Sequence, residues 1–252
     1  MQSSSSYITP TWPAPAHVKA LTTVRQGGYS LKPFDSFNLA LHVNDDPKAV
    51  HANREYLKSV AHLPSDPIWL TQVHGIHVID LKDYCNQEQE NFQMHSIEAD
   101  ASIAFQKNQV CAVLTADCLP ILLCDKKGTR ISAIHAGWKG LAAGIIQSTI
   151  EKLDCDPKTL LVWLGPSIGP KSFEVREDVF AAFKEYQQEA FVETDRGTWN
   201  ADIYQLAREQ LRTKGINHIF GGDYCTYLDV QHFYSYRRSN VTGRMASLIW
   251  MT

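Results

Sequence analysis

The chain has 252 residues, of which 44% are hydrophobic and 20% charged, and these fractions are typical of a globular domain with a full-sized core. Its formal net charge of -3 gives no basic excess, so neither nucleic acid nor an anionic membrane is expected as a partner. No apolar run approaches the roughly 20 residues of a membrane span.

The N-terminal stretch Met1–Pro15 is rich in serine and proline and has no apolar core of the kind found in a secretory signal. We therefore expect a flexible segment over residues 1–20, a single domain over residues 21–252, and a cytoplasmic location. The 6 cysteines form no CxxC pair, so most should be free thiols rather than parts of a disulfide scaffold. The sequence leaves the oligomeric state open and is compatible with a monomer.

Apolar runs bounded by turn residues predict strands along most of the chain. They lie at Ile68–Leu70, Val78–Leu81, Ala101–Phe105, Val110–Leu114, Ile121–Cys124, Ile131–Ile134, Leu160–Leu164, His218–Phe220, Phe233–Tyr236 and Ser247–Met251. Helical periodicity predicts helices at Asp46–His62, Trp138–Leu153, Glu177–Tyr186 and Ala201–Lys214. Strands outnumber helices and do not alternate with them regularly. This pattern argues against a doubly wound sheet and favours a mixed α/β (α+β) fold.

Three short segments hold side chains suited to bind a metal. His74 lies in TQVHG, Cys118 in TADCLP and His135 in IHAGWKG, each next to a predicted strand. One thiolate and two imidazoles suit zinc, and three protein ligands leave a fourth position for water or substrate. The wide spacing resembles no zinc finger. From spacing alone, a packed or hydrogen-bonded side chain is the alternative for each of the three.

Several further motifs occur together and in order: ADASI, TADCLPILL, IHAGWKGLAAGII, LGPSIGP and TGRMASLIW. With TQVHG, they make the chain similar, from about Leu21 to Trp250, to the bacterial YfiH-type laccase-domain family. Proteins of that family were described first as polyphenol oxidases and later as purine nucleoside phosphorylases. The resemblance implies a catalytic domain built as a layered α/β/β/α sandwich with mixed sheets, and it implies that His74, Cys118 and His135 are metal ligands with catalytic roles.

The resemblance also implies a reaction: zinc-dependent phosphorolysis of adenosine, inosine, guanosine or methylthioadenosine, with adenosine deamination as a side activity. Zinc suits both reactions, because it polarises oxygen ligands and lowers the pKa of a bound water. Asp117, beside the predicted cysteine ligand, is expected to act in catalysis as a proton relay or as a support for the ligands, with a turn carboxylate that accepts from backbone N–H groups as the alternative. Arg25, Asn38 and Arg54 lie in segments that match the family's N-terminal motifs and are predicted to bind substrate, with a structural role as the alternative.

Three other functions stay open. Cys118 and His135 suit a cysteine–histidine amide hydrolase that edits peptidoglycan precursors. Cu²⁺ is an alternative metal for the same ligands and would permit weak polyphenol oxidation, although the chain has no HxH pair for a multicopper cluster. A non-catalytic, zinc-stabilised binding domain is the third.

Gly165–Gly169 spells the GxSxG of a serine nucleophile, but Pro166 and Pro170 bracket it and predict a rigid turn.

Overall fold

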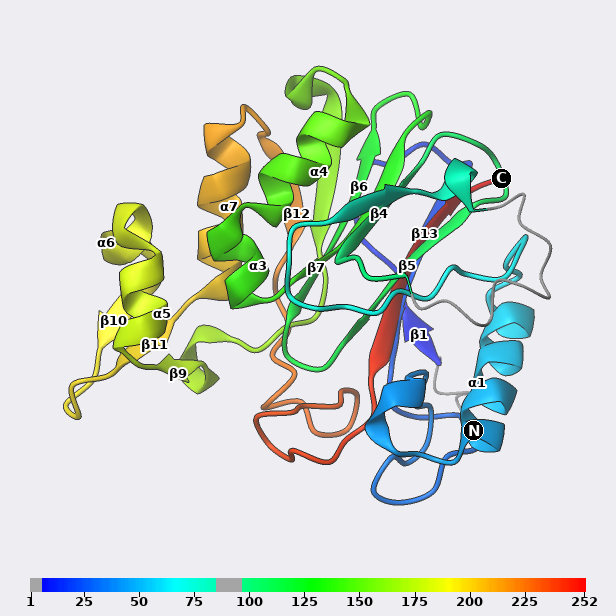
Figure 1. Cartoon of the computed structure of the whole chain (residues 1–252), viewed down its shortest axis with the longest axis horizontal. Helices are drawn as coiled ribbons and strands as arrows, with labels where there is room; N and C mark the ends of the chain where they lie inside the picture. The colour runs from blue at the N-terminus through cyan, green and yellow to red at the C-terminus, as the bar shows by residue number, and fades with distance from the viewer. Residues whose placement is uncertain (1–5, 85–96) are drawn as a thin grey trace.

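Two large β-sheets form the centre of the molecule in the computed structural model, which describes residues 6–84 and 97–252 (Figure 1). The larger sheet has six strands in the order β12-β8-β6-β7-β4-β3. It is mixed, because β12 pairs with β8 and β3 with β4 in parallel, while the other pairs are antiparallel. Its strands are β3 (Val78–Asp80), β4 (Ala101–Ala104), β6 (Leu119–Asp125), β7 (Ile131–Ala136), β8 (Leu160–Leu164) and β12 (His218–Gly221).

The second sheet has four antiparallel strands in the order β1-β2-β13-β5. They are β1 (Tyr7–Ile8), β2 (Val18–Thr23), β5 (Val110–Thr115) and β13 (Met245–Met251). Successive side chains of a strand point to opposite faces, and β5 shows the consequence. Cys111 and Val113 pack in the core between the two sheets, whereas Val110, Ala112 and Leu114 pack in the core on the other face.

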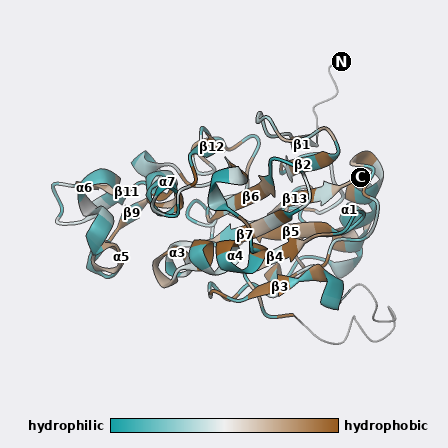
Figure 2. Cartoon of the chain, turned by 90° about the horizontal axis from the view of Figure 1, so that it is seen from above, coloured by the Kyte–Doolittle hydropathy of each residue, from teal (hydrophilic) through white to brown (hydrophobic). Residues whose placement is uncertain are grey.

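Helices cover the outer faces of both sheets. The helices α3 (Trp138–Ala143), α4 (Ile145–Leu153) and α7 (Ile203–Thr213) share one core with the six-stranded sheet. On the other side, α1 (Pro47–Val60) packs through Leu57 against the four-stranded sheet. The expected layered α/β/β/α sandwich with mixed sheets is therefore confirmed. Figure 2 shows hydrophobic residues concentrated along β4, β5, β6 and β7 inside these layers.

Local signals explain where two of the helices begin and end. The α1 helix begins after Asp46, whose side chain accepts a hydrogen bond from the Lys48 amide, with Pro47 in the first turn. The predicted helix Trp138–Leu153 is instead two helices. Gly144 adopts a φ of 99°, in the left-handed region that favours glycine, so α3 ends there and α4 starts in a new direction.

A small lobe packs at the end of the molecule beside α7 (Figure 1). It contains the three-stranded antiparallel sheet β10-β11-β9 and two short helices. The elements are β9 (Glu174–Val175), α5 (Glu177–Ala182), α6 (Gln187–Ala190), β10 (Phe191–Glu193) and β11 (Trp199–Ala201). The rings of Phe180 and Trp199 stack here with centroids 4.2 Å apart. The predicted helix Glu177–Tyr186 is therefore shorter than expected, since its last turn, Lys184–Tyr186, is a separate 3-10 turn.

Two of the predicted strands are not observed. Neither Ile68–Leu70 nor Phe233–Tyr236 is a strand. Each is a loop, and a loop can also bury apolar side chains when its backbone groups find hydrogen-bond partners outside a sheet. Within residues 1–20, β1 and the start of β2 pair in the four-stranded sheet, whereas residues 1–5 lie outside the described residues. The flexible segment over 1–20 and the single domain over 21–252 stay predictions. Alternating polar residues such as Lys19 hide β2 from a search for apolar runs.

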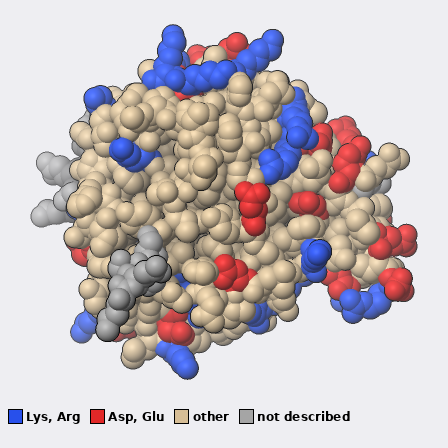
Figure 3. Space-filling view, turned by 180° about the vertical axis from the view of Figure 1, so that it is seen from behind, with Lys and Arg blue, Asp and Glu red and all other residues tan. Residues whose placement is uncertain are grey.

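The surface agrees with the small net charge. On the face shown in Figure 3, acidic and basic side chains both occur around the rim, and uncharged residues cover most of the centre. Among the helices of residues 6–84 and 97–252, none combines the length and apolar character needed to cross a membrane.

Candidate metal centre and its pocket

The register of β6 and β7 brings a cysteine and a histidine together. Cys118 ends the bend that leads into β6, and His135 is the penultimate residue of β7. These two strands are antiparallel and pair Pro120 with His135, so the start of one lies beside the end of the other. His74 lies in a loop rather than directly after a strand, with a φ of 60°. Strand pairing therefore does not position His74 beside Cys118 and His135, and another interaction must do so.

The interaction that positions His74 comes from Asp100, a fully buried residue just before β4. Its carboxylate accepts hydrogen bonds from the backbone amides of Val73 (3.2 Å), His74 (2.9 Å) and Gly75 (2.7 Å). The same carboxylate lies 2.8 Å from Nδ1 of His135. One acidic side chain thus holds the His74 loop and orients the second imidazole, a pattern common around metal-binding histidines.

The three candidate ligands converge as a result. The ligand atoms of His74, Cys118 and His135 all lie within 4.8 Å of one another. The Cys118 Sγ is 3.7 Å from Nε2 of His74, and the two imidazole rings are edge-on with centroids 4.7 Å apart. His135 is buried, Cys118 is half-buried and His74 is exposed. The cluster therefore has a protected side and an open side.

Gly137 is required beside this cluster. A Cβ atom at this position would lie 2.7 Å from Cδ2 of His74 and 3.1 Å from Sγ of Cys118. Gly140, one turn further, would place a Cβ atom 3.1 Å from the carbonyl oxygen of Gly75. The glycines of the IHAGWKG segment therefore allow the start of α3 to approach the His74 loop closely.

The charges of the cluster favour a thiolate. Burial alone would raise the pKa of Cys118, but the charge of His135 and contacts with both imidazoles outweigh it and lower the pKa to about 6. Burial alone would lower the pKa of His135, but the Cys118 thiolate and Asp100 raise it to about 9. Without a metal, the pair is therefore a thiolate beside an imidazolium at neutral pH. A metal that binds here displaces the proton of His135.

Asp117, predicted to act in catalysis, has a carboxylate that is already occupied. Its Oδ1 accepts from the Thr226 hydroxyl (2.6 Å), and its Oδ2 accepts from the Ser235 hydroxyl (3.0 Å) and the Arg237 amide (2.7 Å). It also lines the pocket and has a φ of 92°. These contacts tie two loops to the bend that carries the cysteine.

A cavity of about 520 Å³ opens over the cluster. Its walls hold the three candidate ligands, apolar and aromatic side chains, and two arginines, Arg237 and Arg244. Its larger apolar and aromatic lining residues are Leu114, Trp138, Ile168, Phe173, Ile203 and Tyr236. An apolar pocket with a few convergent polar groups is the usual form of a small-molecule site.

The structure places the three predicted substrate residues outside this lining. Arg25 donates to the carbonyls of Asp35 and Val230, and Arg54 donates twice to the carbonyl of Leu39. The Arg54 guanidinium also lies 4.2 Å from the Trp69 ring centroid. Substrate contact by Arg25 and Arg54 stays a prediction.

Asn38 has a supporting position. It is fully buried, donates to the Ala40 carbonyl and to Asp45, and accepts from the backbone amides of Ala40 and Arg244. Asn38 thus contacts the main chain of a pocket residue and does not line the pocket itself. Its predicted contact with substrate is likewise untested.

Two important residues, Asp100 and Arg244, were not singled out by sequence reasoning. Both precede an apolar strand, and both stand within motifs of the resemblance, ADASI and TGRMASLIW. A polar residue at the edge of a buried strand was the available signal for each. The GxSxG serine, by contrast, is buried, and its hydroxyl donates to the Asp117 carbonyl, as expected for a structural turn.

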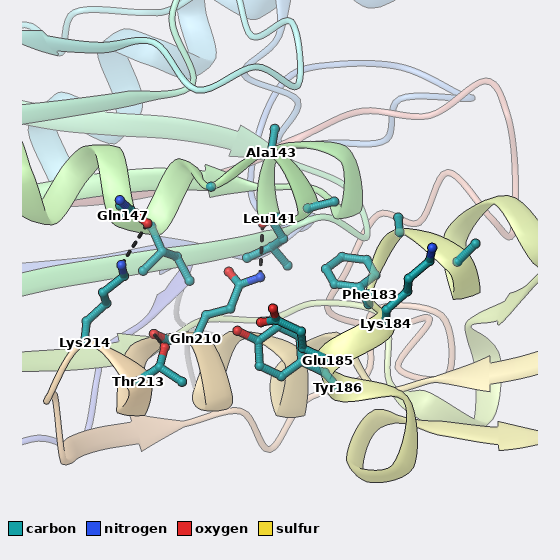
Figure 4. A pocket seen from close by; sticks show the side chains of 15 residues that line it. Leu141, Ala143, Gln147, Phe183, Lys184, Glu185, Tyr186, Gln210, Thr213 and Lys214 are labelled. Carbon is teal, nitrogen blue, oxygen red and sulfur yellow. Dashed lines mark hydrogen bonds between the residues drawn. The ribbon is translucent and has the colours of Figure 1, made fainter.

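A second cavity of about 570 Å³ lies between α3, α4, α7 and the small lobe (Figure 4). Gln210 donates to the Leu141 carbonyl across it, and the Lys214 ammonium donates to Gln147. No histidine or cysteine is among the described residues that line it. The candidate metal ligands His74, Cys118 and His135 therefore belong to the first pocket.

Comparison with known proteins gives near-complete matches. A family model described as "Multi-copper polyphenol oxidoreductase laccase" matches residues 19–252. The Purine nucleoside phosphorylase YfiH of Escherichia coli (strain K12) is 45% identical over 252 residues, covering 98% of this chain and 99% of that protein. The Purine nucleoside phosphorylase of Haemophilus influenzae is 42% identical over 248 residues, covering 96% and 98%.

Solved structures match equally well. A Neisseria meningitidis protein of the family DUF152 superposes with a TM-score of 0.90 at 42% identity, covering 98% of this chain and 99% of that one. The crystal structure of YlmD from Geobacillus stearothermophilus gives a TM-score of 0.91 at 28% identity, covering 100% and 98%.

Proposed function

This chain belongs to the family described as multi-copper polyphenol oxidoreductase laccase, and within it we propose that the chain is a zinc-dependent purine nucleoside phosphorylase. Its substrates are adenosine, inosine, guanosine and methylthioadenosine with phosphate, and adenosine deamination is a side activity of the same pocket. One observation carries the proposal: the Cys–His–His cluster opens into an apolar pocket edged by two arginines. The near-full-length similarity to proteins named purine nucleoside phosphorylase supports it.

The donor set fits zinc. Zinc–sulfur and zinc–nitrogen bonds of ordinary length at a tetrahedral angle separate the two donor atoms by roughly 3.6 Å. The separation between Sγ of Cys118 and Nε2 of His74 is 3.7 Å. His74, Cys118 and His135 would hold the ion with one position left for water or substrate, where the ion would act as a Lewis acid. Cu²⁺ is the alternative occupant of the same ligands.

The chain's own residues bind and orient the reactants. Aromatic side chains such as Trp138, Phe173 and Tyr236 offer apolar surface to a planar purine. In phosphorolysis, a phosphate oxygen forms a bond to the anomeric carbon while the glycosidic bond breaks, and the electron pair leaves with the purine. The arginines on the pocket wall neutralise the charge of the attacking phosphate.

The described residues argue against multicopper oxidation as the main activity. Within residues 6–84 and 97–252, the cluster of His74, Cys118 and His135 is the one group of three such side chains that could hold a metal. Multicopper oxidation needs a cysteine-containing copper site together with further copper sites, so a second group would be required. Weak phenol oxidation by copper-loaded protein is compatible with a single site.

The low pKa of Cys118 favours one other function, amide hydrolysis by a thiolate. The two proposals differ in their dependence on metal. Alkylation of metal-free protein should block a cysteine hydrolase, whereas removal of the metal should abolish phosphorolysis.

The test is a Cys118→Ala variant incubated with inosine and phosphate. Zinc-loaded wild type should release hypoxanthine and ribose 1-phosphate, and the variant should lose at least about 1,000-fold in rate, because a metal ligand is gone. Cys155→Ala is the matched control, since Cys155 is a half-buried free thiol that does not line the pocket. Equal turnover by the Cys118 variant and wild type would show that the centre is wrongly assigned.

A further inference from the structure

Arg244 occupies an unusual position in the pocket wall. It directly precedes β13, and its Nη1 donates to the carbonyls of Thr242 (2.8 Å) and Gly243 (3.1 Å). Its backbone amide donates to the side chain of the fully buried Asn38 (2.9 Å). The residue is therefore held at both its main chain and one edge of its guanidinium. Its remaining donors, Nε and Nη2, have no hydrogen-bond partner among residues 6–84 and 97–252.

The charges of Cys118 and Asp117 act on Arg244 electrostatically, and its guanidinium carbon lies 5.7 Å from the Tyr236 ring centroid. No carboxylate in the described part of the chain forms an ion pair with it. Burial lowers its pKa, yet an arginine keeps its charge at neutral pH. A half-buried cation with two unused donors is costly unless something in the pocket accepts them.

Two other arginines show how guanidinium groups of this chain find hydrogen-bond or ion-pair partners. Arg238 donates to three backbone carbonyls, those of Thr226, Tyr227 and Phe233. Arg25 has a carboxylate partner in Asp35 at 3.6 Å. Arg244 differs from both because its free edge belongs to a residue that lines the cavity over the metal cluster.

The neighbours of Arg244 on the pocket wall are also suited to an anion. Arg237 lines the same cavity, donates to the Glu174 carbonyl (2.9 Å) and lacks an ion pair within the described residues. His42 lines it too, and its partial burial together with the charges of Arg244 and Arg54 lowers its pKa. The carboxylate on this wall, that of Asp117, already accepts three hydrogen bonds.

From this arrangement we propose that Arg244, supported by Arg237 and His42, forms a subsite for a tetrahedral oxyanion, which is the inorganic phosphate consumed in the reaction. The inference rests on the proposed function. A guanidinium with two adjacent free donors matches two oxygens of one phosphate. Because the same cavity contains the metal cluster, phosphate held here shares a space with the nucleoside.

The role of the subsite in the reaction is binding and orientation. The held phosphate forms a bond from one oxygen to the anomeric carbon as the glycosidic bond breaks, and the purine takes the electron pair. No oxidant or other co-reactant is needed. Loss of Arg244 should therefore weaken the use of phosphate more than the use of nucleoside.

The experiment measures phosphate binding and kinetics in zinc-loaded wild type, Arg244→Gln and Arg244→Lys. Calorimetry at constant ionic strength gives the Kd for phosphate, and initial rates give KM for phosphate and for inosine separately. Arg244→Gln should raise both phosphate constants on the order of 10- to 100-fold, as expected for lost hydrogen bonds to a charged ligand. KM for inosine should change by less than about twofold, and Arg244→Lys should recover part of the binding because it restores the charge without the fork.

Arg208→Gln is the matched control. Arg208 in α7 also donates to a backbone carbonyl, that of Gly221, but does not line the pocket, so its phosphate constants should equal those of wild type. Zinc content and circular dichroism establish that each variant is folded and loaded. If Arg244→Gln does not fold, Arg244→Lys provides the test, because loss of the guanidinium fork alone should weaken phosphate binding.

Unchanged phosphate constants in a folded Arg244 variant would overturn the subsite, and so would a selective rise in KM for inosine. Failure of wild type to bind phosphate at all would overturn it too. If wild type binds phosphate through Arg244 but releases no purine, the proposed function fails while the subsite stands. A third result would assign the subsite to the phosphate group of a nucleotide. In that case wild type would bind inosine monophosphate tightly but not free phosphate, and Arg244→Gln would lose the nucleotide binding. This would overturn the proposal that inorganic phosphate occupies the subsite.

Discussion

The pocket has two walls that are built differently: one carries the candidate metal ligands, and the other carries the arginines. Strand register positions Cys118 and His135, and the single buried carboxylate of Asp100 adds His74. The arginine wall consists of loop residues, which Asp117 and backbone carbonyls hold in place. Metal binding and substrate binding should therefore respond to different substitutions.

The largest effect should come from pH acting on the metal wall. His135 has its pKa raised to about 9 and Cys118 has its pKa lowered to about 6, so between these values a metal must displace the proton of His135. Zinc affinity should rise about tenfold for each pH unit from 6 to 9, and more steeply below 6, where the thiol is also protonated. Zinc titrations with a competing chelator across this range measure the slope. An affinity independent of pH between 6 and 9 would contradict the thiolate–imidazolium pair.

The next effect should follow from Asp100→Asn. The amide cannot accept from His135 and from three backbone N–H groups at once, so the His74 loop should loosen. Zinc affinity should fall roughly 10- to 100-fold, as for other carboxylates behind metal-binding histidines. The zinc Kd measures this change.

Asp125→Asn is the control for that substitution. Asp125 is also buried and accepts from the Thr129 amide, the Thr129 hydroxyl and the Arg130 amide, but it holds the β6–β7 turn far along the strands from the cluster. It should lose stability without losing zinc affinity. Equal loss of zinc affinity in both variants would mean that Asp100 acts only through general stability.

The smallest effect should come from Asp117→Asn on the arginine wall. An amide can still accept part of the three hydrogen bonds, so unfolding free energy should fall by about 1–3 kcal/mol. KM for inosine and phosphate should rise several-fold as the Arg237 loop shifts, with zinc affinity unchanged. A fall in kcat of about 1,000-fold at constant KM would instead support the catalytic role predicted from the sequence.

The sequence indicated the layers of the fold because strongly apolar runs such as Leu160–Leu164 and Ile131–Ile134 become buried strands. It did not indicate β2, where Lys19 and two threonines interrupt the apolar pattern. Phe233–Tyr236 was wrong as a strand, because its buried side chains belong to a loop that Asp117 and Arg238 hold through hydrogen bonds. The apolar pattern of a sequence indicates which side chains are buried. The hydrogen-bond partners of the backbone decide whether the buried segment is a strand or a loop.

The candidate site was accessible from the sequence only in part. His74, Cys118 and His135 stood out because their side chains have metal-binding chemistry and their motifs resemble one family. Asp100 and Arg244 did not stand out in the sequence. Their importance comes from hydrogen bonds that are made, or left unmade, in the folded chain. A buried carboxylate with four donors and an arginine with two free donors are properties of the folded chain.

The central claim is that one zinc ion at His74, Cys118 and His135 supports phosphorolysis. The most direct measurement titrates zinc into metal-free protein and follows hypoxanthine release from inosine in phosphate. Activity should rise in proportion to zinc and reach its plateau at about one ion per chain, as expected for a single three-ligand site. Full activity without metal, or activity that requires several copper ions per chain and oxygen, would contradict the account.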